Sequence, residues 1–228
     1  MLIIATPKSA SSSFAASLAE ATATTVTNRV VRDRLRCCPT TNDFPLIAAI
    51  HGENFELDRA ASDILLSIDG VKKHHVPPTP NNLAVLRDVP KVVLTRSAGD
   101  VVDAYWRGFE TGVWTFGHAV MEGARSLEQW RQVARERGLP DEIERFNESW
   151  RNAPGNALLL DFDEVVAEGP AAVSKASRYF GVASGPVSHL AREKFTRTRG
   201  VDALSVFGRV LRRSHQRVRT AYRSLARA

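Results

Sequence analysis

A lysine and a run of hydroxyl side chains follow the first apolar segment of the chain. Residues 2–5 predict a buried strand, and an Ala-rich helical pattern covers 12–20. The turn between them contains Lys8 and five small residues, which are Ser9, Ala10, Ser11, Ser12 and Ser13. Amides at the start of a helix, an ammonium group and hydroxyls together bind anions. We therefore predict that this strand–turn–helix unit holds a phosphate or sulfate group.

Histidines and an arginine come after two further apolar segments. His74 and His75 stand at the end of a weak strand pattern over 69–74, and Arg96 directly follows the strand predicted at 92–95. Because the carboxyl ends of parallel strands meet at one edge of a sheet, we expect these side chains to lie near the first turn. Such a set suits a ligand with several phosphate or sulfate groups, with an imidazole as general base.

The remaining pattern alternates short apolar runs with helical periodicity. Strands are predicted at 2–5, 46–50, 69–74, 92–95 and 157–160, and helices at 12–20, 57–67, 99–109, 126–137, 141–152, 169–180 and 203–226. Alternating strands and helices predict an α/β fold with three layers, in which helices cover both faces of a mostly parallel sheet. We expect a single domain over 1–228 with a basic helical arm at about 203–228.

Local signals mark several helix ends and core positions. Residues 97–100, Ser-Ala-Gly-Asp, predict a capping box that starts a helix right after Arg96. Gly181 is expected to end the helix at 169–180. The tryptophans within predicted amphipathic helices are expected in the core, and these are Trp106, Trp130 and Trp150.

Charge and composition limit the possible partners and compartments. The net charge is +6, and residues 190–228 hold eleven Lys or Arg against two acids, so a basic arm follows a mildly acidic body. A solvated helix face is its simplest interpretation; peripheral contact with a membrane stays open, and nucleic acid is not favoured. No apolar run reaches the ~18 residues that span a bilayer, and no signal peptide is visible, which predicts a cytoplasmic protein. Adjacent Cys37 and Cys38, the only cysteines of the sequence, exclude a disulfide framework and a metal site with four cysteine ligands.

A nucleotide kinase is one alternative for the phosphate-binding turn. The turn departs from the Walker pattern GxxxxGK[ST], because Lys8 precedes the small residues and no Lys-Ser or Lys-Thr pair opens the helix. The run 158–161, Leu-Leu-Leu-Asp, imitates a Walker B strand and is the main feature that favours a kinase. A non-catalytic module that binds anions or nucleic acid through the basic arm is the other alternative.

Five segments, in order, resemble motifs of one enzyme family. Those motifs are T-x-P-K-S-G-T-T-W, K-T-H-x-P, R-N-P-x-D-x-x-x-S, a strand ending Y-E-D-L before a helix closed by F-L-G, and R-K-G. The corresponding stretches here are Thr6–Phe14, Lys73–Pro77, Arg96–Ala104, Phe162–Val165 with Tyr179–Gly181, and Thr198–Gly200. With these motifs the sequence resembles the cytosolic-type sulfotransferases, which have a P-loop-like fold and use 3′-phosphoadenosine 5′-phosphosulfate (PAPS).

The resemblance implies a set of roles for the site residues. His75 would be the general base, with His74 as the alternative, and Lys8 would neutralise charge on the bridging oxygen of the donor. The donor would be held by Lys8, Ser9, Ala10, Ser11, Ser12, Ser13, Arg96, Arg199 and Gly200. The product would be adenosine 3′,5′-bisphosphate (PAP), no metal would be needed, and the acceptor would be a hydroxyl, less readily an amine, of a small molecule, lipid or carbohydrate.

Three positions depart from the family motifs. Ala10 stands where the loop has glycine, so a left-handed backbone there costs more than it would with glycine. Ala104 replaces the serine that would contact the 3′-phosphate, which leaves more of that contact to Arg96. Thr198 replaces the first basic residue of the closing motif, between Arg197 and Arg199.

Overall fold

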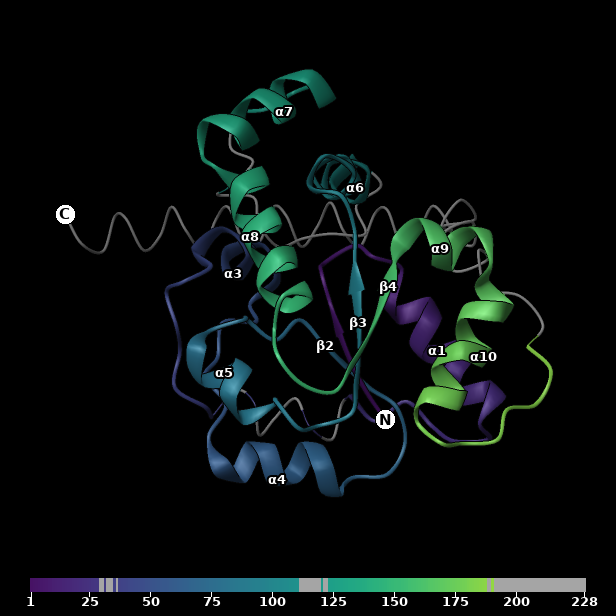
Figure 1. Cartoon of the computed structure of the whole chain (residues 1–228). Helices are drawn as coiled ribbons and strands as arrows, with labels where there is room; N and C mark the ends of the chain where they lie inside the picture. The colour runs from purple at the N-terminus through teal and green to yellow at the C-terminus, as the bar shows by residue number, and fades with distance from the viewer. Residues whose placement is uncertain are drawn as a thin grey trace, which may run out of the picture. The chain divides into compact units, whose positions relative to one another are not determined.

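A parallel sheet of four strands forms the centre of the fold (Figure 1). The computed structural model describes residues 1–28, 31, 35, 37–110, 120, 123–187 and 190. The strands are β1 (Leu2–Ala5), β2 (Lys72–His74), β3 (Lys91–Thr95) and β4 (Ala157–Asp161). Their order in the sheet is β2-β1-β3-β4, and every neighbouring pair is parallel. The predicted α/β class with a parallel central sheet is confirmed.

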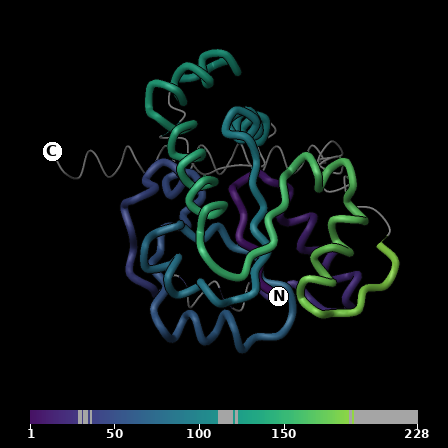
Figure 2. The backbone as a smooth tube through the Cα atoms, in the orientation of Figure 1, coloured from purple at the N-terminus to yellow at the C-terminus, as the bar shows by residue number. Residues whose placement is uncertain are grey.

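Helices cover both faces of this sheet. One apolar cluster includes residues of α1 (Ser11–Ala21), α9 (Phe162–Ala167) and α10 (Gly169–Tyr179). The other includes residues of α3 (Pro45–His51), α4 (Arg59–Ser67), α5 (Pro80–Val85), α6 (Ala98–Glu110), α7 (Leu127–Glu136) and α8 (Leu139–Arg151). The backbone trace in Figure 2 shows α1, in purple, beside α10, in green, and the two helices are in contact. The described part of the chain therefore has the predicted three layers.

The side chains of β1 divide between the two clusters. Ile3 and Ala5 pack on the α1 and α10 side, whereas Leu2 and Ile4 pack on the opposite side. Successive side chains of a strand point to opposite faces, so a strand that is covered on both faces must be apolar throughout. This is why β1 shows an uninterrupted apolar run and no alternation with polar residues.

The strand predicted at 46–50 is wrong, because this segment is helix α3. Pro45 occupies the first turn, where its fixed φ suits a helix and its missing N–H costs nothing. The buried Glu142 carboxylate of α8 accepts hydrogen bonds from the Ile47 amide at 2.7 Å and the Leu46 amide at 3.2 Å. Gly52 then ends the helix with a φ of 71°. A cap supplied by a distant residue thus decides the structure of an ambiguous apolar run.

Several local signals gave correct helix ends and core positions. The Asp100 amide donates to the Ser97 hydroxyl at 3.3 Å, and this hydroxyl donates to the Asp100 carboxylate at 2.8 Å, so α6 begins at the predicted box. Gly181 follows α10 with a φ of 67°. Trp106, Trp130 and Trp150 are all buried. Two short helices, α5 and α9, were not predicted.

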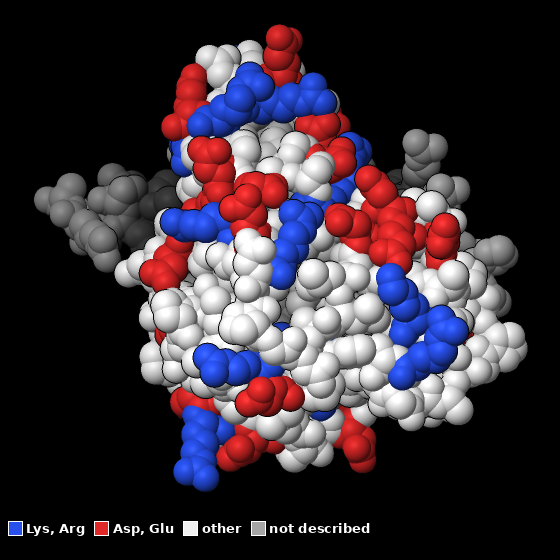
Figure 3. All heavy atoms as spheres, viewed as in Figure 1, with Lys and Arg blue, Asp and Glu red and all other residues white. Residues whose placement is uncertain are grey.

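The described unit extends to Leu190. The predicted basic arm, Arg199 and Gly200 lie outside the described residues, so their roles and the single-domain prediction stay untested. Within the described residues, no helix combines the length and hydrophobicity needed to span a membrane. Figure 3 shows blue Lys and Arg side chains interleaved with red Asp and Glu on the face in view. One ion pair between helices joins Lys175 of α10 to Glu164 of α9 at 2.8 Å.

Candidate functional site

The turn after β1 has a left-handed backbone at two residues, although it contains no glycine. Lys8 and Ala10 both have left-handed backbones, with φ of 64° and 58°, and Ala10 is the N-cap of α1. The buried Ser9 hydroxyl donates to the Thr6 carbonyl at 2.7 Å and so closes the turn. Alanine pays roughly 1–2 kcal/mol for a left-handed conformation. The chain thus keeps a glycine-like turn without the glycine, and the first amides of α1 have no hydrogen-bond partner within the helix.

The hydroxyls of the turn differ in their environments. The Ser9 hydroxyl is hydrogen-bonded to Thr6 within the loop. In the first turn of α1, Ser11 and Ser13 are buried and Ser12 is exposed. Hydroxyls and amides at a helix start favour an anion through their dipoles and the helix dipole. The predicted hydroxyl run is therefore at a helix N-terminus, as expected from the sequence.

Arg96, directly after β3, contacts this turn. Its Nη1 donates to the Lys8 carbonyl oxygen at 2.7 Å, and its guanidinium lies 3.6 Å from the ring centroid of Phe162. Asp100, the acid four residues further on, hydrogen-bonds to Ser97 in the capping box. The structure thus brings together Arg96 and the Lys8 turn, as predicted for the carboxyl ends of neighbouring strands.

His75 lies directly after β2 with its ring buried between two partners. Its Nδ1 is 2.7 Å from the Ala5 carbonyl oxygen, and its Nε2 is 3.2 Å from Lys73 Nζ. A carbonyl oxygen only accepts hydrogen bonds, so Nδ1 carries the proton and Nε2 presents its lone pair to Lys73. His75 therefore shares a side of β2 with Lys73, whereas His74, the last residue of the strand, faces the other way.

Two residues join this cluster that the sequence analysis did not select. The His51 ring, at the end of α3, lies 4.6 Å from the His75 ring, centroid to centroid, and 5.5 Å from the Tyr105 ring. Lys8 Nζ lies 5.8 Å from the centroid of Tyr105. His51 directly follows the apolar run 46–50 and was not selected from the sequence. Its signal was the pairing of Pro45 before and Gly52 after the apolar run, which marks a short helix.

Burial and neighbouring positive charges lower the pKa values of Lys8, His51 and His75. Burial, followed by the charges of Arg107, Arg96 and Lys73, lowers the pKa of Lys8 from 10.5 to about 7. Burial and the charge of Lys73 also hold the pKa of His75 and of His51 well below the usual value. Both rings are therefore neutral at pH 7. An anionic ligand bound at this helix N-terminus would reduce the electrostatic repulsion among the neighbouring cations.

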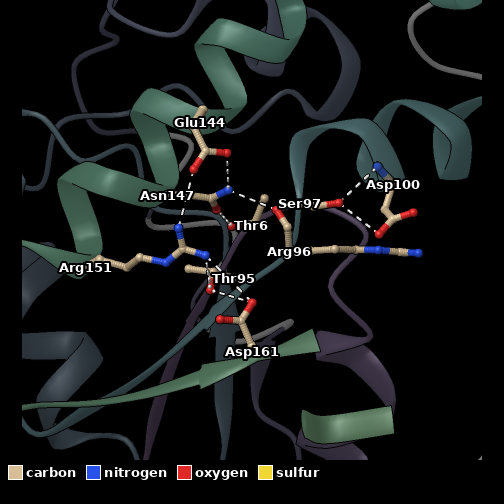
Figure 4. Close-up of polar contacts among 9 residues, drawn as sticks. All are labelled: Thr6, Thr95, Arg96, Ser97, Asp100, Glu144, Asn147, Arg151 and Asp161. Carbon is tan, nitrogen blue, oxygen red and sulfur yellow. Dashed lines mark hydrogen bonds and ion pairs between the residues drawn. The ribbon is translucent and has the colours of Figure 1, made fainter. Parts of the chain in front are cut away.

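A second polar network lies beside Arg96 (Figure 4). Arg151 of α8 donates to the Thr95 hydroxyl at 3.1 Å and pairs with Asp161 at 3.7 Å and with Glu144 at 3.4 Å. Thr95 also donates to Asp161 at 3.3 Å. Asp161, the residue that imitates a Walker B acid, is therefore part of a network that joins the ends of β3 and β4 to α8.

A metal centre has no candidate in the part of the chain that the structure describes. No three His, Cys, Asp or Glu side chains gather there as ligands. Cys37 is exposed and Cys38 is buried.

Comparisons with known proteins are consistent with this architecture. No family model and no curated protein matches the sequence. Among solved structures, a sulfotransferase from Alicyclobacillus acidocaldarius aligns with a TM-score of 0.51 and 13% sequence identity. The alignment covers 83% of this chain and 84% of the sulfotransferase chain. The sulfotransferase domain of the curacin biosynthetic pathway has a TM-score of 0.44 and 12% identity, covering 79% and 73%.

Retinol dehydratase, solved with androsterone and the inactive cofactor PAP, has a TM-score of 0.40 and 14% identity, covering 86% of this chain and 62% of its own. Of these likenesses, the first is close enough to compare folds, and it agrees with the parallel sheet and its helix-covered faces. The chain therefore has the sulfotransferase fold.

Proposed function

We propose that the protein is a PAPS-dependent sulfotransferase that transfers a sulfuryl group to a hydroxyl of a small-molecule, lipid or carbohydrate acceptor. One observation carries the proposal. Lys8, Arg96, Lys73 and the neutral ring of His75 gather around one left-handed turn at a helix N-terminus, and the pKa of Lys8 falls to about 7 because of burial and neighbouring cations. A donor with two separate anionic groups would neutralise such a cluster, and an imidazole stands beside it to take a proton.

The residues present fit the donor chemically. The first amides of α1 and the hydroxyls of Ser11, Ser12 and Ser13 would hold the 5′-phosphate. Arg96 would carry the 3′-phosphate contact, with Arg199 and Gly200 as further proposed contacts. Lys8 would offset the negative charge that grows on the bridging oxygen as the sulfur–oxygen bond breaks. Sulfuryl transfer, like phosphoryl transfer, depends on positioning and charge stabilisation, and no metal is required by these roles.

His75 is the proposed general base. Its Nε2 carries the lone pair because Nδ1 donates to the Ala5 carbonyl, and its lowered pKa leaves the ring neutral at pH 7. The acceptor hydroxyl would give its proton to Nε2 while the acceptor oxygen bonds to sulfur and the phosphate oxygen leaves. Lys73, which contacts Nε2, must withdraw for this step, and a nearby anionic donor would attract its ammonium group.

Labelled PAPS and a panel of hydroxyl and amine acceptors test the proposal. The full chain should transfer label to at least one acceptor class in the presence of a chelator, and Lys8→Met should abolish transfer. Absence of PAP binding together with absence of transfer would overturn the proposal.

The contacts of Asp161 distinguish the proposed function from that of a nucleotide kinase. A Walker B acid must be available to a metal ion and its waters, whereas Asp161 is engaged by Thr95 and Arg151. We expect that Asp161→Asn keeps measurable sulfate transfer and that ATP with Mg²⁺ is not turned over. Mg²⁺-dependent ATP hydrolysis that is lost in Asp161→Asn would favour the kinase.

A further inference from the structure

The Asn147 side chain of α8 bridges the ends of the two central strands. Its Oδ1 accepts a hydrogen bond from the Thr6 hydroxyl, directly after β1, and its Nδ2 donates to the Arg96 carbonyl at 2.9 Å, directly after β3 (Figure 4). Asn147 is fully buried and Thr6 is 1% exposed. One carboxamide therefore joins the two segments that continue into the Lys8 turn and into Arg96.

These contacts form a closed ring of hydrogen bonds. Arg96 Nη1 donates back to the Lys8 carbonyl at 2.7 Å, and Ser9 returns the path to Thr6 through its hydroxyl at 2.7 Å and its amide at 3.3 Å. The ring thus runs from Thr6 through Asn147 and Arg96 to the turn and back. The buried Thr6, Ser9 and Asn147 side chains and the half-buried Arg96 side chain supply the links, so the ring restrains the separation between the turn and Arg96.

The chemistry of the bridge is specific to an amide. Thr6 offers a donor and the Arg96 carbonyl offers an acceptor, so the residue between them must accept on one atom and donate on another. Aspartate would set a carboxylate oxygen against the Arg96 carbonyl, and leucine would leave the buried Thr6 hydroxyl and the Arg96 carbonyl without these hydrogen bonds. Helix α8 is itself held over the strand ends by Arg151, one turn further on, through Thr95 and Asp161.

We propose that Asn147 is a positioning residue that sets the distance between the two phosphate-binding ends of the donor site, so that both phosphates of one nucleotide bind together. This inference rests on the proposed function, in which the turn and Arg96 take different phosphates. A ligand held at two points gains affinity only while both points can be reached at once. Asn147 therefore controls the advantage of the bisphosphate over either monophosphate.

Nucleotide binding to the full chain tests this role by calorimetry. The ligands are PAP, which has both phosphates, and adenosine 5′-monophosphate and adenosine 3′-monophosphate, which have one each. For Asn147→Leu we expect the affinity for each monophosphate to stay within about threefold, while the preference for PAP over the monophosphates falls about tenfold or more. An equal loss for all three ligands, or an unchanged preference, would overturn the proposal.

Matched variants keep the test interpretable. Asn82→Leu removes another fully buried amide, which bonds Pro77, Phe55 and Leu57, and it should lower the melting temperature without changing the preference for PAP. If Asn147→Leu does not fold, Thr6→Val is used instead. It removes only the hydrogen bond from Thr6 to Asn147 and should reduce the preference for PAP, whereas Thr6→Ser keeps the hydroxyl and should keep the preference. If PAP does not bind the unmodified chain, the proposed function fails; if PAP binds but the preference is unaffected by these changes, only the role of Asn147 fails.

Discussion

Lys73 Nζ lies 3.2 Å from His75 Nε2. This nitrogen carries no proton, because the proton of the ring is on Nδ1, which donates to the Ala5 carbonyl. An ammonium group therefore occupies the lone pair that a general base would use. Burial and the charge of Lys73 hold the pKa of His75 well below its usual value. In the proposed function, a donor anion beside Lys73 would weaken this effect and would thereby couple the basicity of His75 to donor binding.

The two adjacent histidines give a direct test of the base. His75→Ala should lower kcat by about 10²–10⁴-fold, because it removes the proton acceptor, and should leave PAP affinity nearly unchanged. His74→Ala is the matched control, since its ring points from the other face of β2. Steady-state kinetics with PAP calorimetry separate these effects. A loss of transfer in His74→Ala but not in His75→Ala would contradict the assignment.

The lowered pKa of Lys8 predicts how donor affinity depends on pH. Its pKa is about 7 in the ligand-free protein against 10.5 in an unstructured chain, so between these values the folded state binds fewer protons than the unfolded state. The penalty for holding the charged lysine is therefore fully present below pH 7 and is relieved as pH rises from 7 to 10.5. A bound anion raises the pKa again, so PAP binding above pH 7 must take up a proton.

Calorimetry in buffers of different ionisation enthalpy measures this uptake. At pH 8 we expect proton uptake on PAP binding and a PAP affinity that weakens as pH rises further. Lys8→Met should abolish the uptake. Lys175→Met, at a surface lysine paired with Glu164, is the control and should leave it unchanged. Proton release, or uptake that persists in Lys8→Met, would contradict the electrostatic account.

Ala10 is a position where one substitution should stabilise the fold. Its φ of 58° is strained for alanine and relaxed for glycine, although glycine also adds entropy to the unfolded chain. The net gain for Ala10→Gly should be up to ~1 kcal/mol in the free energy of unfolding. Ala19→Gly, in the interior of α1, should instead destabilise by about 0.5–1 kcal/mol. Denaturant unfolding compares the two, and a destabilising Ala10→Gly would contradict the observed backbone.

Features that depend on local information are predictable from the sequence. The turn after β1 and the capping box at Ser97 and Asp100 are set by residues close together in the chain, and both were predicted at the right place. Parallel strands then bring Arg96 and His75 to the same edge, which general topology is enough to anticipate.

Features that depend on distant residues could not be predicted from the sequence. Helix α3 takes its cap from Glu142, which lies 95 positions from Ile47, so an apolar run of ambiguous length was read as a strand. The Asn147 bridge joins residues 141 positions apart, and a single asparagine in a helical pattern gives no local sign of it. The left-handed backbone at Ala10 goes against the intrinsic preference of alanine, and the glycine at this position of the resembling family motif was its signal in the sequence.

In the proposed function, the Lys8 turn and Arg96 form the site of a bisphosphorylated sulfate donor. Calorimetric titration of the full chain with PAP, in the presence of a chelator, measures this binding. We predict saturable binding of one PAP per chain, which weakens strongly in Lys8→Met and in Arg96→Met. Absence of saturable PAP binding, or binding that neither substitution affects, would contradict it.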